Sequence, residues 1–266
     1  MQYQKMVVIF IDIIGSKEIT GFDQKYEIHK LFHTSVRESQ LRQGSEAHSH
    51  VAYDRRLFSF SDCAYVTYFY KSEIEENRKN DEELLQTALF NTSILALRLA
   101  SRGFRVRGGV TFGDTFVDED GCSGPAVEEA YRLESKVALF PRILLSQEIG
   151  KSQYDFETEI QSSPGFSMLN RMTRDRVSRI VNLDDDGNFY LNIFYQLEMD
   201  NVLIYDGEEL TLDKIKSVLL AKIAAERIKH KDDERISIKL DWFAKYLSNV
   251  KCCVKEGQAT FSVALS

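Results

Sequence analysis

The chain has 266 residues, of which 43% are hydrophobic, and its 41 acidic side chains outnumber 34 basic ones to give a formal net charge of −7. This hydrophobic fraction is enough for the core of one large domain, or of one domain with an appendage. The acidic balance argues against a broad basic face for a nucleic-acid polymer or a membrane surface. A few placed cations or metal ions must therefore hold any anionic ligand.

The cysteines and the apolar segments indicate the cellular compartment of the protein. The four cysteines include no C-x-x-C pair, which is typical of a reduced, intracellular protein. No basic region followed by an apolar region and a cleavage site opens the chain, and polar residues interrupt the most apolar later segment, Leu84–Ala100. We therefore expect a cytoplasmic protein without a signal peptide or a membrane-spanning helix.

The first predicted strand is Val7–Gly15, VVIFIDIIG, which carries Asp12 inside a continuous apolar run. Such a run is typical of a strand buried on both faces. A carboxylate placed there needs a partner that compensates for its lost hydration, and a metal ion is a common one. Asp12 is therefore a candidate metal ligand, although a helix cap at the end of the strand is an open alternative.

A second aspartate follows the same logic. After an amphipathic helix over Phe22–Leu41, two strands are predicted at Val51–Phe60 and Cys63–Tyr70, and Asp62 lies at their junction. Asp62 is either a second metal ligand or a simple turn former. Two strand-borne aspartates could share one pair of cations.

The next elements complete an alternating order up to about residue 148. They are a helix at Glu82–Ser101 capped by Asp81, a strand at Phe104–Phe112, a turn-rich excursion at Gly113–Ser123, a helix at Ala126–Val137 with Pro125 in its first turn, and a strand at Arg142–Ser146. The order is β-α-β-β-α-β followed by a further helix and strand. It predicts an α+β fold, a ferredoxin-like sandwich with helices on one face of an antiparallel sheet.

The remaining third has a weaker pattern. It is predicted to contain a mixed segment at Tyr154–Arg176, strands at Ile180–Leu183 and Phe189–Phe194, and helices at Leu212–Lys229 and Asp233–Asn249. Repeats and linker-like runs are absent from the sequence. We therefore expect residues 149–266 to form a C-terminal α/β extension that packs on the core within the same compact domain.

Four sequence blocks carry a family resemblance. Gly124–Ser135, GPAVEEAYRLES, is similar to the G-x-x-V-N-x-A-x-R-M-E segment of class III nucleotidyl cyclases, and Arg105–Gly113, RVRGGVTFG, resembles the R-x-G-[IV]-x-x-G strand of that family. FIDIIG at Phe10–Gly15 and FSFSDCAYV at Phe58–Val66 precede them in the order of the family. The resemblance covers about residues 7–146 and implies that residues 1–148 are a cyclase catalytic core.

Within this family, the short pattern with FIDI-G, SDC and G-x-A-x-x-x-A-x-x-L-E looks most like the stand-alone pyrimidine cyclases of the bacterial Pycsar antiphage system. The resemblance implies conversion of UTP to 3′,5′-cyclic UMP and pyrophosphate, a messenger for a separate cyclic-nucleotide-binding effector. Cyclic CMP from CTP is the alternative, because the two bases differ only in the donor and acceptor at the 4-position. The sequence favours no nucleic-acid polymer and no membrane as a partner.

The resemblance also implies roles for single residues. Asp12 and Asp62 match the two aspartates that bind two Mn²⁺ or Mg²⁺ ions per active site, and Ile13 matches the position whose backbone carbonyl helps to hold the second ion. Arg132 matches the arginine that steadies the reacting phosphate. In the family the aspartates and the arginine come from different protomers of a homodimer with two shared sites, and we expect the same here.

Further nucleotide contacts are predicted around the phosphates and the ribose. The turn that contains Gly15 and Ser16 offers backbone N–H groups to a phosphate. Glu128 occupies the place of an asparagine that positions the ribose in the purine cyclases of this class. This departure from the family pattern leaves the ribose contact open.

The base-reading positions of the purine enzymes fall near Phe58 and Gly121 in this chain, and neither side chain can read a purine edge. This difference favours a pyrimidine substrate, with Phe58, Tyr53, Arg55 or Arg56 as candidate contacts.

Two other functions are weighed against the cyclase. A palm-type nucleotidyltransferase or cyclic-dinucleotide synthase also uses paired carboxylates on a ferredoxin-like sheet, but the chain has no G-G-D-E-F-like hairpin. A catalytically dead sensor domain would bind a nucleotide only, and the retention of Asp12, Asp62 and Arg132 argues against it.

Overall fold

The central sheet is organised around its first strand. The computed structural model describes residues 2–43, 51–165, 174–200, 202–205, 207–255 and 263–265, except for the side chains of 35–43 and 263–265. Strand β1 (Gln4–Ile13) lies between β3 (Cys63–Tyr70) and β4 (Val106–Val117), and β2 (Tyr53–Phe60) lies outside β3. All neighbouring pairs among these four strands are antiparallel. The predicted α+β class and the strand order of a ferredoxin-like βαββαβ unit are confirmed.

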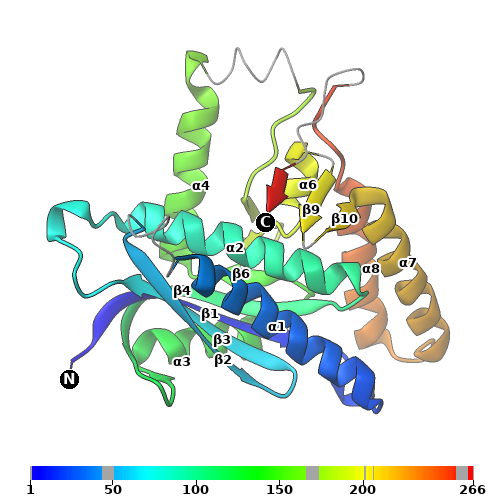
Figure 1. The fold of residues 1–266 in the computed structure, drawn as a ribbon. Coiled ribbons are helices and arrows are strands. Elements are labelled where there is room, and N and C mark those ends of the chain that lie inside the picture. Colours follow the sequence, from blue (N-terminus) through cyan, green and yellow to red (C-terminus); the bar gives the residue numbers. More distant parts are fainter. Residues whose placement is uncertain are drawn as a thin grey trace.

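Helices cover both faces of this sheet. Helices α1 (Phe22–Gln43) and α2 (Asp81–Ser101) lie on one face, and α3 (Pro125–Arg132) lies on the other (Figure 1). Side chains alternate along a strand, so the odd-numbered residues of β1 enter the main core under α1 and α2, and Val8 and Phe10 pack against α3. This explains the continuous apolar run. The two helices of the βαββαβ unit therefore share one face, as predicted, and the further helix α3 covers the other face.

Three local predictions differ from the structure. The N-cap of α2 is Asn80 rather than Asp81, because the Asn80 side chain accepts the N–H groups of Glu82 and Glu83. The predicted helix at 126–137 changes after α3 into a π-helical turn at Leu133–Val137.

The third difference is the turn-rich excursion, which is mostly strand. Strand β4 continues to Val117 because β1 offers it partners as far as the pair Gln4 and Thr115. It then forms a short hairpin with β5 (Cys122–Ser123).

The C-terminal third continues the same sheet. Strand β6 (Ile143–Leu145) is parallel to β4, and β8 (Phe189–Leu191) joins β6 to the edge strand β7 (Val181–Leu183). Within the described ranges this gives a sheet with the order β2-β3-β1-β4-β6-β8-β7. The other elements are α4 (Gln147–Ser162), α6 (Tyr195–Asp200), α7 (Leu212–Lys229), α8 (Glu234–Asn249), and a second sheet of β9 (Val202–Tyr205), β10 (Glu208–Thr211) and β11 (Val263–Leu265). Both predicted C-terminal helices are confirmed, and residues 166–173 of the predicted mixed segment lie outside the described residues.

A buried arginine joins β6 to the C-terminal part. The Arg142 guanidinium pairs with Asp184 and Asp186 in the β7–β8 turn, and its side chain is 1% exposed. It also lies 5.5 Å from the Trp242 ring centroid on α8. A buried charge of this kind requires partners, so Arg142 holds the β7–β8 turn and α8 against the start of β6.

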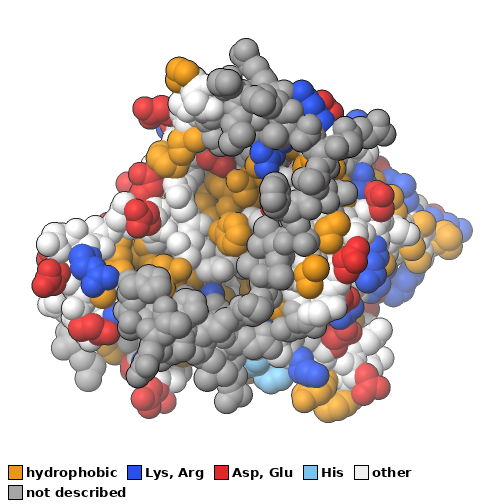
Figure 2. Space-filling model, turned by 45° about the horizontal axis from the view of Figure 1, so that its top comes forward, with side chains coloured by type: hydrophobic (Ala, Val, Ile, Leu, Met, Phe, Trp, Pro, Cys, Tyr) orange, Lys and Arg blue, Asp and Glu red, His pale blue; other side chains and the backbone are white. Residues whose placement is uncertain are grey.

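The surface charges, the helices and the cysteines complete the description of the fold. Among the described residues, acidic and basic side chains are interspersed on the face shown in Figure 2. No helix in the described ranges has the length and apolar character that a membrane crossing needs. All four cysteines are free thiols.

Candidate functional site

Strand pairing brings the two predicted metal-binding aspartates to one end of the sheet. Asp12, the penultimate residue of β1, is directly opposite Cys63 of β3. Asp62 immediately precedes Cys63 in the β2–β3 turn, and its backbone carbonyl accepts the N–H of Ile13 at 3.1 Å. Two acids fifty positions apart in the sequence are therefore neighbours in the fold.

The two carboxylates have different electrostatic surroundings. Burial raises the pKa of Asp12 to about 6, and the like charges of Glu134 and Asp62 add to this increase. Burial also raises the pKa of Asp62, but hydrogen bonds from Ser16 and Ser61 outweigh it and hold the pKa below its ordinary value. Asp62 is thus an anion at neutral pH, and ionised Asp12 would be stabilised by an added cation.

The turn after β1 positions Asp62. The buried Ser16 hydroxyl donates to the Asp62 carboxylate, and Gly15 has a φ of 80°, which favours glycine. The turn leads into a three-residue 3₁₀ helix, whereas α1 begins only at Phe22. The N–H groups of Ile13 and Ile14 are already bonded to backbone carbonyls. Any backbone contact from this turn to a phosphate therefore begins at Gly15.

Sequence reasoning missed two charged residues beside Asp12. Arg107 of β4 is directly opposite Asp12, and its guanidinium lies 3.6 Å from the Asp12 carboxylate. The same guanidinium contacts Glu134, whose side chain is only 4% exposed. The strand register could have located Arg107, since antiparallel pairing of RVRGG with FIDII places it opposite Asp12. Glu134 stands at the final glutamate of the GPAVEEAYRLES block, but the π-helical turn through which it reaches the site was not predicted.

The donor set fits a divalent cation. Asp12, Asp62 and the carbonyl of Ile13 would supply hard oxygen ligands, which suit Mg²⁺ or Mn²⁺. Of the three neighbouring acids, Asp12 and Glu134 contact one guanidinium, that of Arg107, whereas Asp62 adds a further negative charge beside Asp12. Among the described side chains, no group of three or more His, Cys, Asp or Glu residues could hold a metal. A cation here would therefore need further ligands from substrate phosphates, as is usual for Mg²⁺.

Arg132 and Glu128 lie apart from these carboxylates. Both side chains are exposed on α3, one helical turn apart. The Arg132 guanidinium forms two hydrogen bonds with Glu129, at 2.6 and 2.7 Å. Within one copy of the chain, the described contacts do not bring Arg132 to Asp12.

The candidate base contacts divide between the two faces of the sheet. Phe58 pairs with Tyr65, whose ring centroid lies 4.6 Å from that of Phe10. Phe58 is therefore on the same face as Asp12, and Arg56 lies two residues further along this face. This places Phe58 nearer than Arg56 to the Asp62 turn.

Tyr53 and Arg55 belong to the opposite face. Tyr53 packs against the main core, and Arg55 is buried with its Nη1 atom 3.3 Å from the Tyr68 hydroxyl. Tyr53 is also nine residues before Asp62, and a strand advances about 3.3 Å per residue. The structure does not bring Tyr53 together with the two aspartates.

The pKa of Asp12 gives a stability prediction for protein kept free of metal by a chelator. The ionised carboxylate is disfavoured in the folded state, so wild-type stability falls as pH rises from about 4 past 6, by on the order of 2–3 kcal/mol. Asp12→Asn removes this cost. The variant should gain unfolding free energy over wild type at about pH 8 but not at about pH 4 in urea denaturation, and an equal difference at both pH values would contradict the prediction. Asp213→Asn, at an exposed position of α7, is the control.

Comparisons with known proteins add only a distant likeness. No protein-family model matches the chain, and no curated protein matches it at a significant level. Among solved structures, the monomeric guanylyl cyclase domain of the RhoGC fusion protein from the aquatic fungus Blastocladiella emersonii is 13% identical over 72% of this chain and 96% of that chain, with a TM-score of 0.37.

Two further structures are similar to the same extent. The guanylate cyclase domain of RhGC from Catenaria anguillulae, in complex with GTP, is 14% identical over 72% of this chain and 98% of that chain, with a TM-score of 0.38. An adenylate/guanylate cyclase/hydrolase from Silicibacter pomeroyi is 12% identical over 72% and 96%, also with a TM-score of 0.38. Scores this low carry no conclusion about function.

Proposed function

We propose that this protein is a divalent-metal-dependent nucleotidyl cyclase that converts UTP to 3′,5′-cyclic UMP and pyrophosphate. The observation that carries the proposal is the meeting of Asp12 and Asp62 at one end of the sheet, where burial and like charge favour an added cation. The four sequence blocks that resemble class III cyclases support it, and the absence of purine-reading side chains at Phe58 and Gly121 favours a pyrimidine. The alternative substrate is CTP.

Each residue then has a defined task. When bound, the two Mg²⁺ or Mn²⁺ ions would lower the pKa of the ribose 3′-hydroxyl and neutralise the triphosphate. Asp12, Asp62 and the Ile13 carbonyl would hold the ions, and the Ser16 hydroxyl keeps Asp62 ionised and oriented. The planar Arg132 guanidinium would donate several N–H groups to the negative charge that develops on the transferring phosphate.

A homodimer would complete the site. Arg132 is exposed on α3 and would reach the aspartates of a second copy rather than those of its own chain. Two exposed aromatic side chains flank these residues: Phe60, two positions before Asp62, is 81% exposed, and Tyr131, next to Arg132, is 52% exposed. Exposed aromatic groups are typical of surfaces that bind another protein. We propose two shared active sites per dimer.

The cellular role rests on the sequence resemblance alone. In this proposal the protein is cytoplasmic, its residues 1–148 form the catalytic core, and residues 149–266 are an extension of the same domain. Its product would act on a separate cyclic-nucleotide-binding effector in defence against phages.

A second candidate function is a nucleotide-binding domain without catalysis. Arg107 favours it, because its guanidinium already places positive charge 3.6 Å from Asp12 and against Glu134. In that case the nucleotide would bind without a metal requirement.

One assay separates these functions. Purified protein is incubated with each of the four NTPs and Mn²⁺, and the products are identified by mass spectrometry. We expect cyclic UMP from UTP, none with excess EDTA, and about a hundredfold less, or lower still, with Asp62→Ala. Cyclic CMP would select the alternative substrate, whereas a linear or cyclic dinucleotide would overturn the proposal. Metal-independent UTP binding without turnover would select the second candidate.

A further inference from the structure

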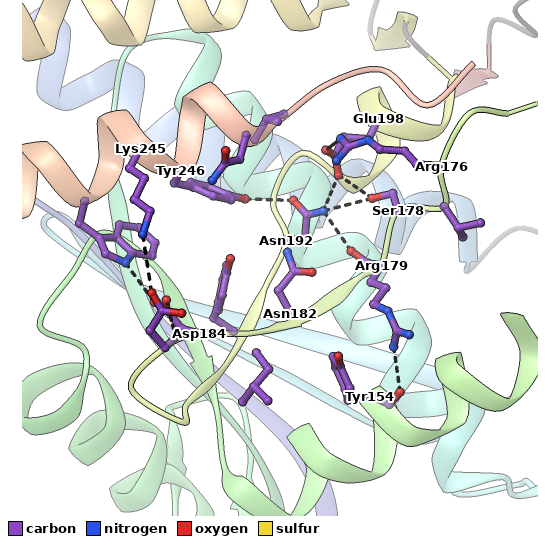
Figure 3. Close-up of a pocket in the computed structure, with 17 residues that line it drawn as sticks. Tyr154, Arg176, Ser178, Arg179, Asn182, Asp184, Asn192, Glu198, Lys245 and Tyr246 are labelled. Atoms are coloured by element: carbon purple, nitrogen blue, oxygen red, sulfur yellow. Dashed lines mark hydrogen bonds and ion pairs between the residues drawn. The ribbon is translucent and has the colours of Figure 1, made fainter. Parts of the chain in front are cut away.

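A cavity of about 380 Å³ lies between α4, the β7–β8 hairpin and α8 (Figure 3). Its volume is within the range of small-molecule sites. All the residues that line it fall between Tyr154 and Val250, so none belongs to the proposed nucleotide site. The cavity is therefore a separate place where a ligand could bind.

One wall of the cavity is aromatic. The Tyr190 ring packs edge-on against Trp242 and Tyr246, with centroid distances of 6.1 and 5.9 Å. Trp242 and Tyr246 are themselves stacked at 5.5 Å on one side of α8. Burial raises the pKa of Tyr190 to about 12, so its phenol is neutral at physiological pH. Such a wall suits a planar ring.

The acidic side chains of the lining are already paired. The pairs are Asp184 with Arg142, Glu198 with Arg176, and Asp185 with Lys245 at 3.6 Å. Glu198 also accepts hydrogen bonds from the Ser178 hydroxyl and the Asn192 amide, at 2.5 and 2.8 Å. The charges of these acids are thus balanced without a ligand.

Arg179 differs from the other cations of the lining. Its guanidinium lies 4.4 Å from the Tyr154 ring centroid, and its Nη1 atom donates to the Tyr154 carbonyl and the Thr158 hydroxyl, at 3.2 and 2.8 Å. Among the described residues, no carboxylate is in ion-pair contact with it. Burial raises the pKa of Glu157, the charge of Arg179 partly offsets this increase, and the Glu157 carboxylate accepts hydrogen bonds from two backbone N–H groups at the start of β7. Arg179 is therefore held in place with further N–H donors available.

We infer that this cavity binds a small aromatic organic anion. The planar ring would lie against the wall of Tyr190, Trp242 and Tyr246, and a phosphate or carboxylate would pair with the Arg179 guanidinium. In Figure 3, Asn182 lies between Tyr246 and Tyr154, where its amide could bond to the ligand between ring and anion. This inference does not depend on the proposed cyclase activity.

Isothermal titration calorimetry of the full chain tests the inference with phenyl phosphate and benzoate as probes. We expect saturable binding of one molecule per chain, and the tighter probe distinguishes a phosphate ester from a carboxylate as the natural group. Phenol has the aromatic ring without the anionic group, and inorganic phosphate has the anion without the ring, so both should bind more weakly. Arg179→Gln should weaken the binding of the tighter probe about tenfold or more, as expected for a charged hydrogen-bond pair.

Control variants and a second cavity variant complete the test. Arg235→Gln, at an exposed position of α8 outside the cavity, should leave binding unchanged, and so should Asp62→Ala at the other site. Asn182→Ala provides a second cavity variant if Arg179→Gln does not fold, as judged by thermal unfolding. The inference is overturned if neither aromatic probe binds, if inorganic phosphate binds as tightly as both, if the folded cavity variants bind like wild type, or if Asp62→Ala abolishes binding.

Discussion

Asp62→Ala and Arg132→Ala should each reduce cyclase activity by about a hundredfold or more, because each removes a group that stabilises charge in the transition state. A mixture of the two inactive variants should recover activity. Asp62 lies in the β2–β3 turn, and Arg132 is exposed on α3, where its hydrogen bonds to described residues are with Glu129 alone. A shared site would take one residue from each protomer.

The size of the recovery follows from symmetry. If protomers exchange freely in an equal mixture, about half of the dimers contain one copy of each variant, and one of their two sites is intact. The mixture should thus reach about a quarter of the wild-type rate. The measurement is cyclic nucleotide formed per protomer after incubation of the mixture, with Asp213→Ala and Arg235→Ala as controls at exposed positions. If the mixture stays as inactive as its components, the site is not shared between protomers.

The first part of the site could be predicted because it depends on local pattern and strand order. The apolar run around Asp12 identifies a buried strand, and the pair of strands on either side of Asp62 identifies a hairpin. A ferredoxin-like order then places β3 beside β1. Two acids at the ends of neighbouring strands must come close together.

The remaining charges of the site depend on geometry that the pattern does not contain. Glu134 turns inward because the helix after Arg132 widens into a π-helical turn, whereas a regular helix was expected. Asn80 caps α2 instead of Asp81, and both residue types are good caps at adjacent positions. To choose between them, one must know at which of the two residues the first turn of the helix begins.

The C-terminal cavity could not be predicted from the sequence, for a related reason. Its aromatic wall joins Tyr190 from an edge hairpin to Trp242 from a helix, and no periodic pattern links these segments. The buried Arg142 that holds them together comes from a third segment. Only tertiary pairing creates this arrangement.

Gly109→Ala should lower the free energy of unfolding by about 3 kcal/mol, because a methyl group has no space between β4 and α3. An added Cβ atom would lie 2.3 Å from the backbone oxygen of Ala130 and 2.7 Å from the Cβ atom of Leu133. The first contact is with backbone, so α3 itself must move away from the sheet. Val8 and Phe10, which pack under α3, would lose contacts as it moves.

The same displacement should reduce activity beyond the loss of stability. Arg132 ends α3, and Glu134 follows in the turn that reaches Arg107, so a shift of the helix moves Glu134 relative to Asp12 and displaces Arg132, which would act in the shared site with a second copy. Misplacement of a positioning group by about 1 Å can cost on the order of a hundredfold in rate. Urea denaturation and cyclase assays, run at a temperature where circular dichroism shows a folded variant, measure the two effects separately. Gly21→Ala is the control, because its Cβ atom would meet only the Gln24 side chain at 3.9 Å. If Gly109→Ala unfolds like wild type, α3 does not pack tightly on β4 at Gly109. If the folded variant keeps full activity, α3 does not position Arg132 for the reaction.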